Sequence, residues 1–376
     1  MKILHVVPYF KPSWEAGGPP RSVYEISYRQ AKLGHDVTVY TTDGFKRRIN
    51  VVKNRAINVD GINVYYFRNL SMFLSSHNIP LPYYMPIVAR KEIKDYDIVH
   101  IHEFRNFLAL VAYYYARKYN VPYVLQPRGS APRFSKTIRK KIFDFIGSKI
   151  FYNACRIIAS SKIESRQYKK VFPKVNMSRV VHIPNGINPW ELPKKGRFKK
   201  KFGIEGKMIL YLGRIHERKG LDLLIKAYSK LNNEDVTLVI AGPDDHYLGK
   251  LKKLIKKIDK KVVLTGPIYG KEKIEAYTDA DVFVLPSKDY YESFGNVVLE
   301  AMVCGTPVIV TKYCGISEWI NDEVGRIINY DVNELVKALK ELLSYNSRSK
   351  VRKFALSKFT WDNVVKETMK VYEQCI

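Results

Sequence analysis

The chain has 376 residues, which is too many for one ordinary core and fits two domains of usual size. Its hydrophobic share of 46% and charged share of 27% exclude a disordered, collagenous or coiled-coil protein. Because the chain has 64 Lys and Arg residues and only 36 Asp and Glu residues, its formal net charge is +28 and an anionic partner must be considered. The first half holds most of this charge, with 31 basic and 11 acidic residues up to Trp190 against 33 and 25 after it.

The cysteines and the apolar runs indicate where the protein works. Cys155, Cys304, Cys314 and Cys375 form no C-x-x-C pair, so neither a zinc knuckle nor a disulfide framework is expected. We expect reduced, cytosolic thiols. The apolar run at the N-terminus is too short for a signal peptide and lacks a cleavage site. No stretch approaches the ~20 apolar residues of a transmembrane helix, so we expect a cytoplasmic protein, free or on the surface of a membrane.

Short apolar segments alternate with amphipathic segments along almost the whole chain, which is typical of parallel βαβ units. In the first half, strands are expected at Lys2–Tyr9, Asp36–Thr41, Asn63–Phe67, Ile98–His102, Tyr123–Gln126, Arg156–Ala159 and Val180–Ile183. The helices expected there are Arg21–Leu33, Phe107–Lys118, Lys136–Phe151 and Lys162–Val171.

A second series of the same kind follows. Its expected strands are Met208–Gly213, Thr237–Gly242, Val262–Gly266, Val282–Pro286, Pro307–Thr311 and Arg326–Asn329. Its expected helices are Leu221–Leu231, Leu248–Ile258, Lys271–Thr278, Asn296–Cys304 and Val332–Leu343, with one more amphipathic helix at Trp361–Glu373.

The stretch between the two series, rich in proline, glycine and lysine, indicates a linker. We therefore expect a first domain over residues 1–190, a linker over 191–206, a second domain over 207–360 and a terminal helix over 361–376. The fold class expected is α/β, with two Rossmann-like, doubly wound parallel-sheet domains that face each other across a cleft. Ligands of such sheets bind at the C-terminal ends of the strands.

The strongest candidate site is the segment from Tyr291 to Gly305. Glu292 lies in a loop and Glu300 lies about a turn and a half into the next helix, so both carboxylates can face one cleft. Two glutamates eight residues apart are by themselves usually a solvated face, but a glycine between loop and helix favours a bound ligand. The N–H groups that would form an anion site at this helix start belong to Phe294, Gly295, Asn296 and Val297. A phosphate-bearing ligand with sugar hydroxyls fits this pattern.

A second candidate is the loop Gly213–Gly220, between a strand and a helix. Arg214 and Lys219 would lie at the C-terminal end of that strand and suit a diphosphate. A merely basic surface loop is the alternative.

Two further candidates lie in the first half. Gly17 and Gly18 precede a helix and offer N–H donors, although a plain turn would look the same. His100 and His102 share one face of a strand, and His102 lies at the end where ligands bind. Two histidines at this spacing can hold a metal, but no third ligand is evident, so we expect no metal site.

Other patterns carry less weight. The D-x-D sequences Asp95–Asp97 and Asp279–Asp281 both precede strands, at the edge opposite the expected ligand, so we reject them as metal sites. The phosphate-binding patterns G-x-G-x-x-G and G-x-x-x-x-G-K-[ST] are missing from the sequence, which disfavours dehydrogenases and P-loop enzymes. Basic residues run into an apolar, aromatic stretch over 136–152, which suits a membrane surface unless the apolar residues are core.

Together these motifs resemble the retaining glycosyltransferases of family 4, which have the GT-B fold. The resemblance rests on Gly17-Gly18, His102, Gly213-Arg214 with Lys219, and the E-x7-E pair Glu292 and Glu300. Supporting phrases are Ile183-Pro184-Asn185-Gly186, Pro286-Ser287 and the helix that begins at Trp361. The resemblance covers the whole chain and is most specific from Gly213 to Gly305. Pro19-Pro20 departs from the pattern of many relatives, which bears on the acceptor and not on the donor.

The resemblance implies a role for each matching residue. Glu300 would hold the donor ribose, and Glu292 would hold the donor sugar together with the backbone of residues 294–297. Arg214 and Lys219 would neutralise the diphosphate, which Gly18 would approach from the other domain. His102 would touch the donor sugar near the reacting carbon. The donor would be a UDP- or GDP-sugar, and the acceptor a glycan or a lipid-linked hydroxyl in polysaccharide, glycolipid or glycoprotein assembly.

The resemblance also implies catalysis without a metal or cofactor, because cations and a helix terminus can stabilise the leaving diphosphate. No obvious nucleophile lies beneath the anomeric carbon, so we favour retention by same-face attack over double displacement. A nucleotide-sugar 2-epimerase of the same fold, a sugar-nucleotide sensor and a basic nucleic-acid binder remain alternatives. The charge is spread over helices and no nucleic-acid motif is recognised, so no nucleic-acid partner is expected.

Overall fold

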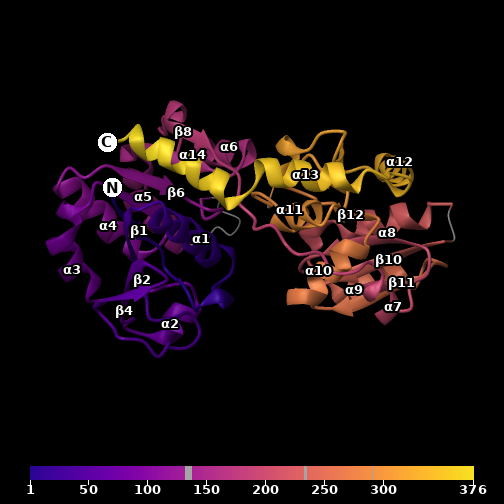
Figure 1. The fold of residues 1–376 in the computed structure, drawn as a ribbon, viewed down its shortest axis with the longest axis horizontal. Coiled ribbons are helices and arrows are strands. Elements are labelled where there is room, and N and C mark those ends of the chain that lie inside the picture. The colour runs from indigo at the N-terminus through magenta and orange to yellow at the C-terminus, as the bar shows by residue number, and fades with distance from the viewer. Residues whose placement is uncertain (132–137, 233–234, 291) are drawn as a thin grey trace. The chain divides into compact units, whose positions relative to one another are not determined.

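The computed structural model describes residues 1–131, 138–232, 235–290 and 292–376, without the side chains of residues 138–142 and 146. These residues form two units, one of Met1–Gly186 with Trp361–Ile376 and one of Ile187–Thr360. Both chain termini therefore belong to the first unit (Figure 1).

The first unit is built on an eight-stranded sheet with the order β3-β4-β2-β1-β5-β6-β7-β8. Neighbouring strands run parallel except for the antiparallel pair β3 and β4. Its strands are β1 (Lys2–Val6), β2 (Asp36–Thr42), β3 (Ala56–Val59), β4 (Ile62–Phe67), β5 (Ile98–His102), β6 (Tyr123–Gln126), β7 (Arg156–Ala159) and β8 (Val180–His182). Its helices are α1 (Gly18–Lys32), α2 (Met72–Ser76), α3 (Met85–Glu92), α4 (Phe107–Lys118), α5 (Ile138–Asn153), α6 (Lys162–Val171) and α14 (Trp361–Glu373), with short 3-10 turns η1 (Trp14–Ala16), η2 (Ile93–Asp95) and η3 (Met177–Arg179).

Alternation along β1 and β5 sorts their side chains onto two covered faces. Leu4 and Val99 pack in the core that also holds α3 and α4, whereas Ile3 and Ile98 pack in the core beneath α14. Because both faces of the sheet are covered and apolar, the sequences of the central strands are nearly continuous hydrophobic runs, which is typical of parallel strands buried on both faces. The polar exceptions on the α14 side are His5, His100 and His102, and all three are buried.

The second unit is built on a six-stranded parallel sheet with the order β11-β10-β9-β12-β13-β14. Its strands are β9 (Lys207–Leu212), β10 (Val236–Ala241), β11 (Val262–Gly266), β12 (Val282–Leu285), β13 (Val308–Thr311) and β14 (Gly325–Ile328). Its helices are α7 (Arg197–Lys201), α8 (Leu221–Ser229), α9 (Leu248–Ile255), α10 (Gly270–Asp279), α11 (Asn296–Val303), α12 (Val332–Leu343) and α13 (Arg348–Lys358), with 3-10 turns η4 (Glu217–Lys219) and η5 (Gly315–Trp319).

The prediction of two Rossmann-like parallel-sheet domains is confirmed. The stretch 191–206, expected as a linker, instead lies within the second unit. Phe198 of α7 is fully buried in that unit's core, and Asp279 accepts hydrogen bonds from the N–H groups of Gly196 and Lys199. The basic run 199–201 is therefore part of helix α7, which packs within the second unit, and does not join two domains. Four further elements were not predicted from the sequence, namely β3, α2, α3 and α13.

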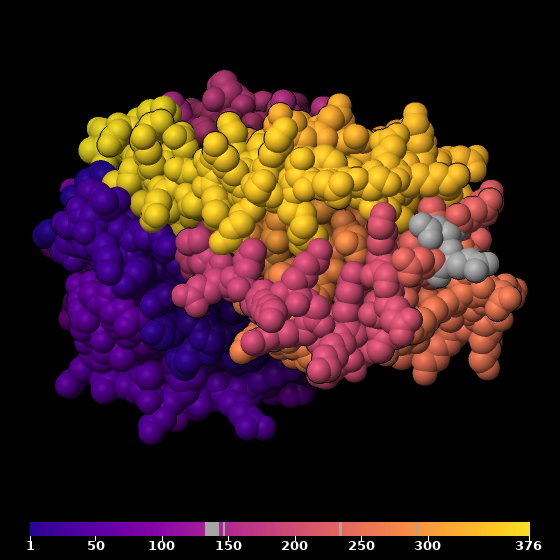
Figure 2. All heavy atoms as spheres, turned by 45° about the vertical axis from the view of Figure 1, so that its right-hand side comes forward, coloured from indigo at the N-terminus to yellow at the C-terminus, as the bar shows by residue number. Residues whose placement is uncertain are grey.

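Helix α14 ends the chain on the first unit, where its buried face packs on Ile3, Ile26 and Ile98. Its yellow atoms lie against the indigo atoms of the N-terminal residues (Figure 2). A disulfide joins Cys155, just before β7, to Cys375, just after α14. The expectation that all four thiols are reduced is therefore wrong for this pair, whose partners lie 220 residues apart in the chain. Cys304 and Cys314 are free, buried thiols.

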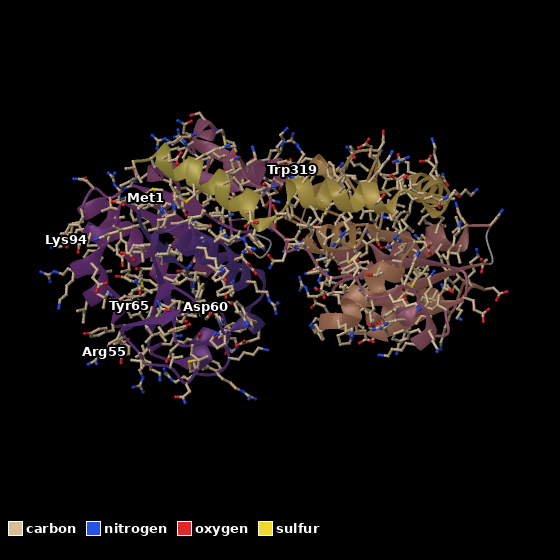
Figure 3. All side chains as sticks on the ribbon, in the orientation of Figure 1. Met1, Arg55, Asp60, Tyr65, Lys94 and Trp319 are labelled. Atoms are coloured by element: carbon tan, nitrogen blue, oxygen red, sulfur yellow. A yellow bond between two sulfur atoms is a disulfide. The ribbon has the colours of Figure 1, made fainter. Side chains whose placement is uncertain are left out.

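The surface expected to contact membranes is only partly described. Residues 136 and 137 lie outside the described residues, as do the side chains of Arg139, Lys140 and Lys141. Farther along α5, Ile150 and Phe151 are buried core residues, whereas Phe145 is 84% exposed. Exposed basic side chains also occur elsewhere on this unit, and Figure 3 shows Arg55 and Lys94 at its periphery. Within the described part of the chain, no helix is long and apolar enough to span a bilayer.

Candidate active site

Two loops at the C-terminal edge of the second sheet are packed backbone to backbone. The loop after β9 ends at Gly220, which has a left-handed φ of 70° and precedes α8. A Cβ at this position would lie 1.9 Å from the carbonyl oxygen of Pro286, in the loop after β12. The main-chain N–H of Lys288 also donates to the carbonyl of Arg218. Glycine at 220 therefore lets the two candidate loops of this unit lie in direct contact.

The loop that holds Glu292 is fixed from its other side by the segment after β13. The N–H of Gly315 donates to the Glu292 carbonyl at 3.0 Å, and the N–H of Ile316 donates to the Phe294 carbonyl at 2.7 Å. Gly295 has a φ of 104° and lies just before α11, where a Cβ would come within 2.8 Å of the Cys314 sulfur. The first N–H groups of α11, which begins at Asn296, have no carbonyl four residues back within the helix. The helix start is thus held in place by the segment after β13, and the N–H of Val298 already donates to the Gly295 carbonyl at 2.9 Å.

Lys219 and Glu292 form an ion pair between these two loops. Their side chains are 12% and 20% exposed, so both charges are largely withdrawn from water. The sequence analysis selected both residues, and the structure brings them together. Breaking a part-buried ion pair of this kind is unfavourable, because either charge alone would be poorly solvated.

Glu300 lies on α11 and has two partners on α10. The Lys273 ammonium lies 2.7 Å from one carboxylate oxygen, and the Tyr277 hydroxyl donates to the other at 2.9 Å. Burial raises the pKa of Tyr277 well above its ordinary value, with a further contribution from the Glu300 charge. Lys273 and Tyr277 were not selected from the sequence. Their spacing of four residues, which places both on one helix face, was the available signal.

Arg214 has a different partner from the one expected. Its guanidinium donates to Asp245 in the loop after β10 at 2.7 Å, and its side chain is 50% exposed. Arg214 and Lys219 thus belong to the same loop but engage carboxylates from different loops.

The glycine pair of the first unit lies directly before α1. Gly17 has a φ of 109° and Gly18 is the first residue of the helix, with Pro19 and Pro20 next. Proline lacks an N–H, so it suits the first turn, where amides have no helical partner. The donors at this helix start are correspondingly few, because the N–H of Gly17 also donates to the Trp14 carbonyl at 3.2 Å, and the expected role of Gly17 and Gly18 stays a prediction.

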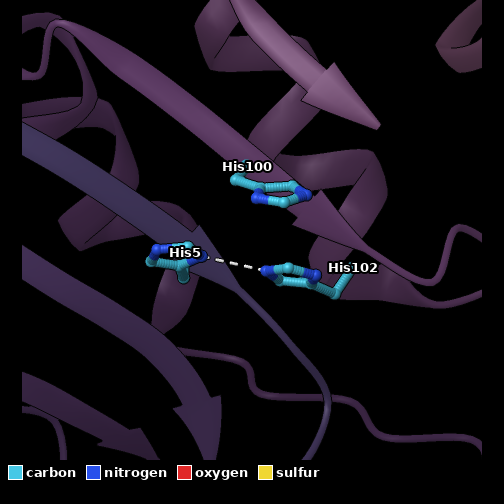
Figure 4. A group of neighbouring side chains, drawn as sticks. All are labelled: His5, His100 and His102. Carbon is cyan, nitrogen blue, oxygen red and sulfur yellow. Dashed lines mark hydrogen bonds between the residues drawn. The ribbon is translucent and has the colours of Figure 1, made fainter. Parts of the chain in front are cut away.

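His102 ends β5 and lies in a buried cluster with His5 and His100 (Figure 4). Its Nε2 and the Nδ1 of His5 are 2.9 Å apart, and the Nε2 of His5 is 2.7 Å from the side-chain amide oxygen Oε1 of Gln30. On the outer side, the Arg128 guanidinium donates to the Nδ1 of His102 at 3.2 Å. His102 is 1% exposed, so its expected contact with a donor sugar stays a prediction.

These contacts fix the protonation of the cluster. Because His102 accepts from Arg128 at Nδ1, its proton is on Nε2 and is donated to His5, which in turn donates to Gln30. Burial lowers the pKa of His5 to about 4 and lowers those of His100 and His102 well below 6.5. His102, His5 and Gln30 therefore form a relay of neutral hydrogen-bonded groups, and the cation Arg128 lies at one end of it.

The same three histidines meet the geometric condition for a metal, since their ligand atoms lie within 4.8 Å of one another. The expectation that no third ligand is near His100 and His102 is thus wrong, because it overlooked His5 on the neighbouring strand. The chemistry nevertheless disfavours a cation here. The inward nitrogen of His102 carries a proton, and a divalent ion would lie beside the Arg128 guanidinium in a buried place.

The remaining acidic motifs have structural partners. Asp97 accepts from the N–H of Lys2, and Asp281 accepts from the N–H of Met208 and pairs with Lys199. These aspartates join neighbouring elements at the N-terminal ends of the strands. A cavity of about 760 Å³ also opens at that edge of the first sheet, beside the disulfide and Arg156, and so lies away from the ligand edge.

Comparisons with known proteins agree with this arrangement. The model of Glycosyltransferase Family 4 matches residues 16–191, and that of glycosyl transferases group 1 matches residues 194–357. An uncharacterized glycosyltransferase of Methanocaldococcus jannaschii is 31% identical over 397 aligned positions, which cover 96% of each chain. Sucrose-phosphate synthase of Thermosynechococcus elongatus superposes with a TM-score of 0.71 at 18% identity, over 99% of this chain and 98% of that one. Anabaena HepE, crystallised with UDP, superposes with a TM-score of 0.75 at 16% identity, over 99% and 100%.

Proposed function

Because the chain belongs to the family 4 glycosyltransferases, we propose that it transfers a hexose from a UDP- or GDP-sugar to an acceptor hydroxyl with retention of configuration. The observation that carries the proposal is the Lys219–Glu292 ion pair, which lies beside the start of α11 at the C-terminal edge of the second sheet. HepE, a structural neighbour, was crystallised with UDP-glucose, which supports a donor of this class.

The proposed donor would meet three groups of the second unit. Its diphosphate would bind Lys219 and Arg214 and the N–H groups at the start of α11, so that negative charge on the leaving group is stabilised as it develops. Glu292 would then be free to accept hydrogen bonds from the sugar hydroxyls. Glu300 would accept from the ribose hydroxyls through lone pairs that Lys273 and Tyr277 leave available.

No metal ion enters the proposed mechanism, since lysine, arginine and backbone donors supply the positive charge. Retention would follow from attack on the same face that the diphosphate leaves, with a donor phosphate oxygen taking the acceptor proton. The roles expected of His102, Gly17 and Gly18 toward the donor are part of the same proposal.

The acceptor is proposed to be a glycan or lipid-linked molecule at the inner face of the cell membrane. The excess of basic residues up to Trp190 would attract an anionic surface, at about 1 kcal/mol for each basic residue near it. Phe145 on α5 supplies an exposed aromatic side chain. Sedimentation with anionic and neutral vesicles at low and high salt tests this docking, and equal, negligible binding to both contradicts it.

A cytoplasmic location is part of the proposal, and the disulfide makes it testable. Disulfides are rare in reducing compartments, outside certain hyperthermophiles. Trapping the thiols of Cys155 and Cys375 with an alkylating reagent in intact cells therefore distinguishes the two cases. A pair that is fully oxidised in cells would favour an oxidising compartment or such a host.

Product formation separates the proposed function from its alternatives. A transferase gives free UDP or GDP and a glycosylated acceptor, an epimerase converts the sugar nucleotide without an acceptor, and a sensor or nucleic-acid binder gives neither product. A thermal-shift panel of UDP- and GDP-sugars identifies the donor first, since a ligand at 100 times its Kd stabilises the folded protein by about 2.7 kcal/mol.

A further inference from the structure

Two strained residues lie side by side at the ligand edge of the first sheet. Glu103 follows β5 with a φ of 59°, and Arg128 lies two residues after β6 with a φ of 51°. The strands are neighbours in register, with His102 opposite Gln126, and the N–H of Glu103 donates to the Gln126 carbonyl at 2.9 Å. Side chains other than glycine rarely adopt this backbone conformation, and such strain is concentrated at functional sites.

Only some of the N–H donors of the Arg128 guanidinium form hydrogen bonds. Its Nε donates to His102, whereas its Nη2 is buried and has no hydrogen-bond partner among the described residues. Among the described residues, no carboxylate lies within ion-pair distance of it. Arg105, in the loop after β5, is also part-buried but has partners for its N–H groups. Asp144 lies 2.7 Å from its Nε, and the Ala131 carbonyl accepts from its Nη2.

The groups that face Arg128 do not neutralise it. His5, from β1, and His100 and His102, from β5, stay neutral because burial lowers their pKa values. Tyr168, from α6, and Tyr372, from α14, have raised pKa values for the same reason. Burial lowers the pKa of Arg128 to about 10, which leaves it a cation at neutral pH.

Two carboxylates lie nearby without pairing with the guanidinium. Glu164, on α6, accepts from the main-chain N–H groups of Gly129 and Ser160. Burial raises the pKa of Glu103 to about 7, so that this carboxyl is partly protonated near neutral pH. Among the described residues, Gln126 Oε1 and His100 Nε2 are also buried without hydrogen-bond partners, so this part of the first unit has unused polar atoms as well as a cation without a carboxylate partner.

We propose that Arg128 binds a phosphate group of the acceptor at the C-terminal edge of the first sheet, a role that rests on the proposed transfer function. A guanidinium with free N–H groups matches phosphate oxygens in a fork geometry, and an anion removes the cost of an unpaired, desolvated charge. The relay through His102 and His5 to Gln30 fixes the position of Arg128, and Glu103 beside it makes anion binding dependent on pH. The phosphate can belong to a soluble sugar phosphate or to a lipid headgroup.

The test measures anion binding to the full chain by calorimetry at constant ionic strength, with inorganic phosphate as the probe. Arg128→Gln should weaken one class of phosphate binding at least tenfold. Arg90→Gln, the same charge change at an exposed residue of α3, should leave binding within twofold of the unsubstituted protein. Equal effects of the two variants would overturn the proposal. Because only the difference between variants is used, phosphate bound at Lys219 does not affect the result.

Two further arms sharpen the assignment. Sulfate, which stays dianionic between pH 6 and 8, should bind several-fold more tightly at pH 6, and Glu103→Gln should abolish this dependence. An Arg128-dependent response to sulfate with no pH dependence would overturn the role of Glu103. Vesicles with phosphatidic acid in phosphatidylcholine test the lipid source: binding that is lost in Arg128→Gln but kept in Arg90→Gln assigns a headgroup, and its absence assigns a soluble phosphate.

UDP binding in the same preparations distinguishes this proposal from the proposed function. Arg128→Gln should bind UDP as the unsubstituted protein does, because the residues proposed to bind the diphosphate and the ribose all lie in the second unit. If the unsubstituted protein does not bind UDP or GDP, the donor proposal fails while the phosphate result still stands or falls on Arg128.

Discussion

The cations of the two units are held in different ways. In the second unit, Lys219, Lys273 and Arg214 each lie against a carboxylate, so the candidate donor site is already neutralised by its own residues. In the first unit, Arg128 faces neutral imidazoles and has no carboxylate within ion-pair distance among the described residues. A phosphate that binds in the second unit would have to replace a carboxylate as the partner of each cation, whereas one that binds Arg128 would replace none.

Breaking the Lys219–Glu292 pair should have the largest effect. Lys219→Gln removes the cation proposed for the diphosphate and leaves Glu292, which is 20% exposed, without its partner. Loss of a charge-assisted bond of about 1.5–3 kcal/mol from the transition state, together with like-charge repulsion of the donor, should lower kcat/KM about a hundredfold or more. Steady-state kinetics with the identified donor measure it. Lys288→Gln, an exposed lysine of the same loop region, serves as the control and should stay near the unsubstituted rate.

Acid should disturb the first unit before the second, because of the histidine cluster. His5 has a folded-state pKa near 4 against about 6.5 when unfolded, so its stabilisation is present above pH 6.5 and is lost as the pH falls toward 4. The shift corresponds to about 3 kcal/mol, and the neighbouring rings add to it in the same direction.

Urea unfolding at pH 7 and pH 4.5 checks this expectation. The variant His100→Leu, which removes a ring from the cluster, should be less sensitive to acid than the unsubstituted protein. His77→Gln, at an exposed histidine, is the matched control and should keep the full sensitivity. An unfolding free energy that does not change between the two pH values contradicts the account of a buried neutral relay.

Replacing Glu300 should weaken the donor without unfolding the protein. Glu300→Gln keeps the size of the side chain and an acceptor for Tyr277 but removes the charge that pairs with Lys273. We expect donor affinity to fall by about 1.5–3 kcal/mol and the unfolding midpoint to change little. Titration calorimetry measures the affinity. If it is unchanged, Glu300 does not bind the ribose.

Removal of metal ions should have the smallest effect. The candidate donor site holds its positive charge in Lys219, Arg214 and Lys273, and both D-x-D motifs bind backbone at the opposite strand ends. Activity should therefore survive an excess of chelator. Complete loss of activity, restored by manganese or magnesium, would show that a cation does what these residues are proposed to do.

Much of the fold was predictable because its signals are local. Apolar strands that end in glycine or proline and alternate with amphipathic helices gave two parallel-sheet domains, and the motif from Glu292 to Glu300 follows directly from its loop and helix. The short strand β3 was missed because its residues 56–59 are partly exposed and include Asn58, which disfavours a strand. Helices α2 and α3 were missed because both are short and the residues around them show no strong helical periodicity of apolar side chains.

The parts that could not be predicted depend on contacts between distant residues. His5 and His102 are 97 residues apart, His100 and Tyr372 are 272 apart, and the two disulfide partners are 220 apart. Only strand order brings such residues together, so a lone histidine on β1 gave no sign of the cluster. Arg128 was missed for a similar reason, because the lack of a partner is a property of the folded surroundings and leaves no trace in the sequence.

The most direct test of the central claim is a titration of UDP- and GDP-sugars into the full chain, carried out with the unsubstituted protein and with Lys219→Gln. We predict that at least one sugar nucleotide binds at one site per chain and that Lys219→Gln weakens that binding at least tenfold. If no sugar nucleotide of either class binds, or if binding is indifferent to Lys219, the assignment of the donor site to the loops after β9 and β12 is contradicted.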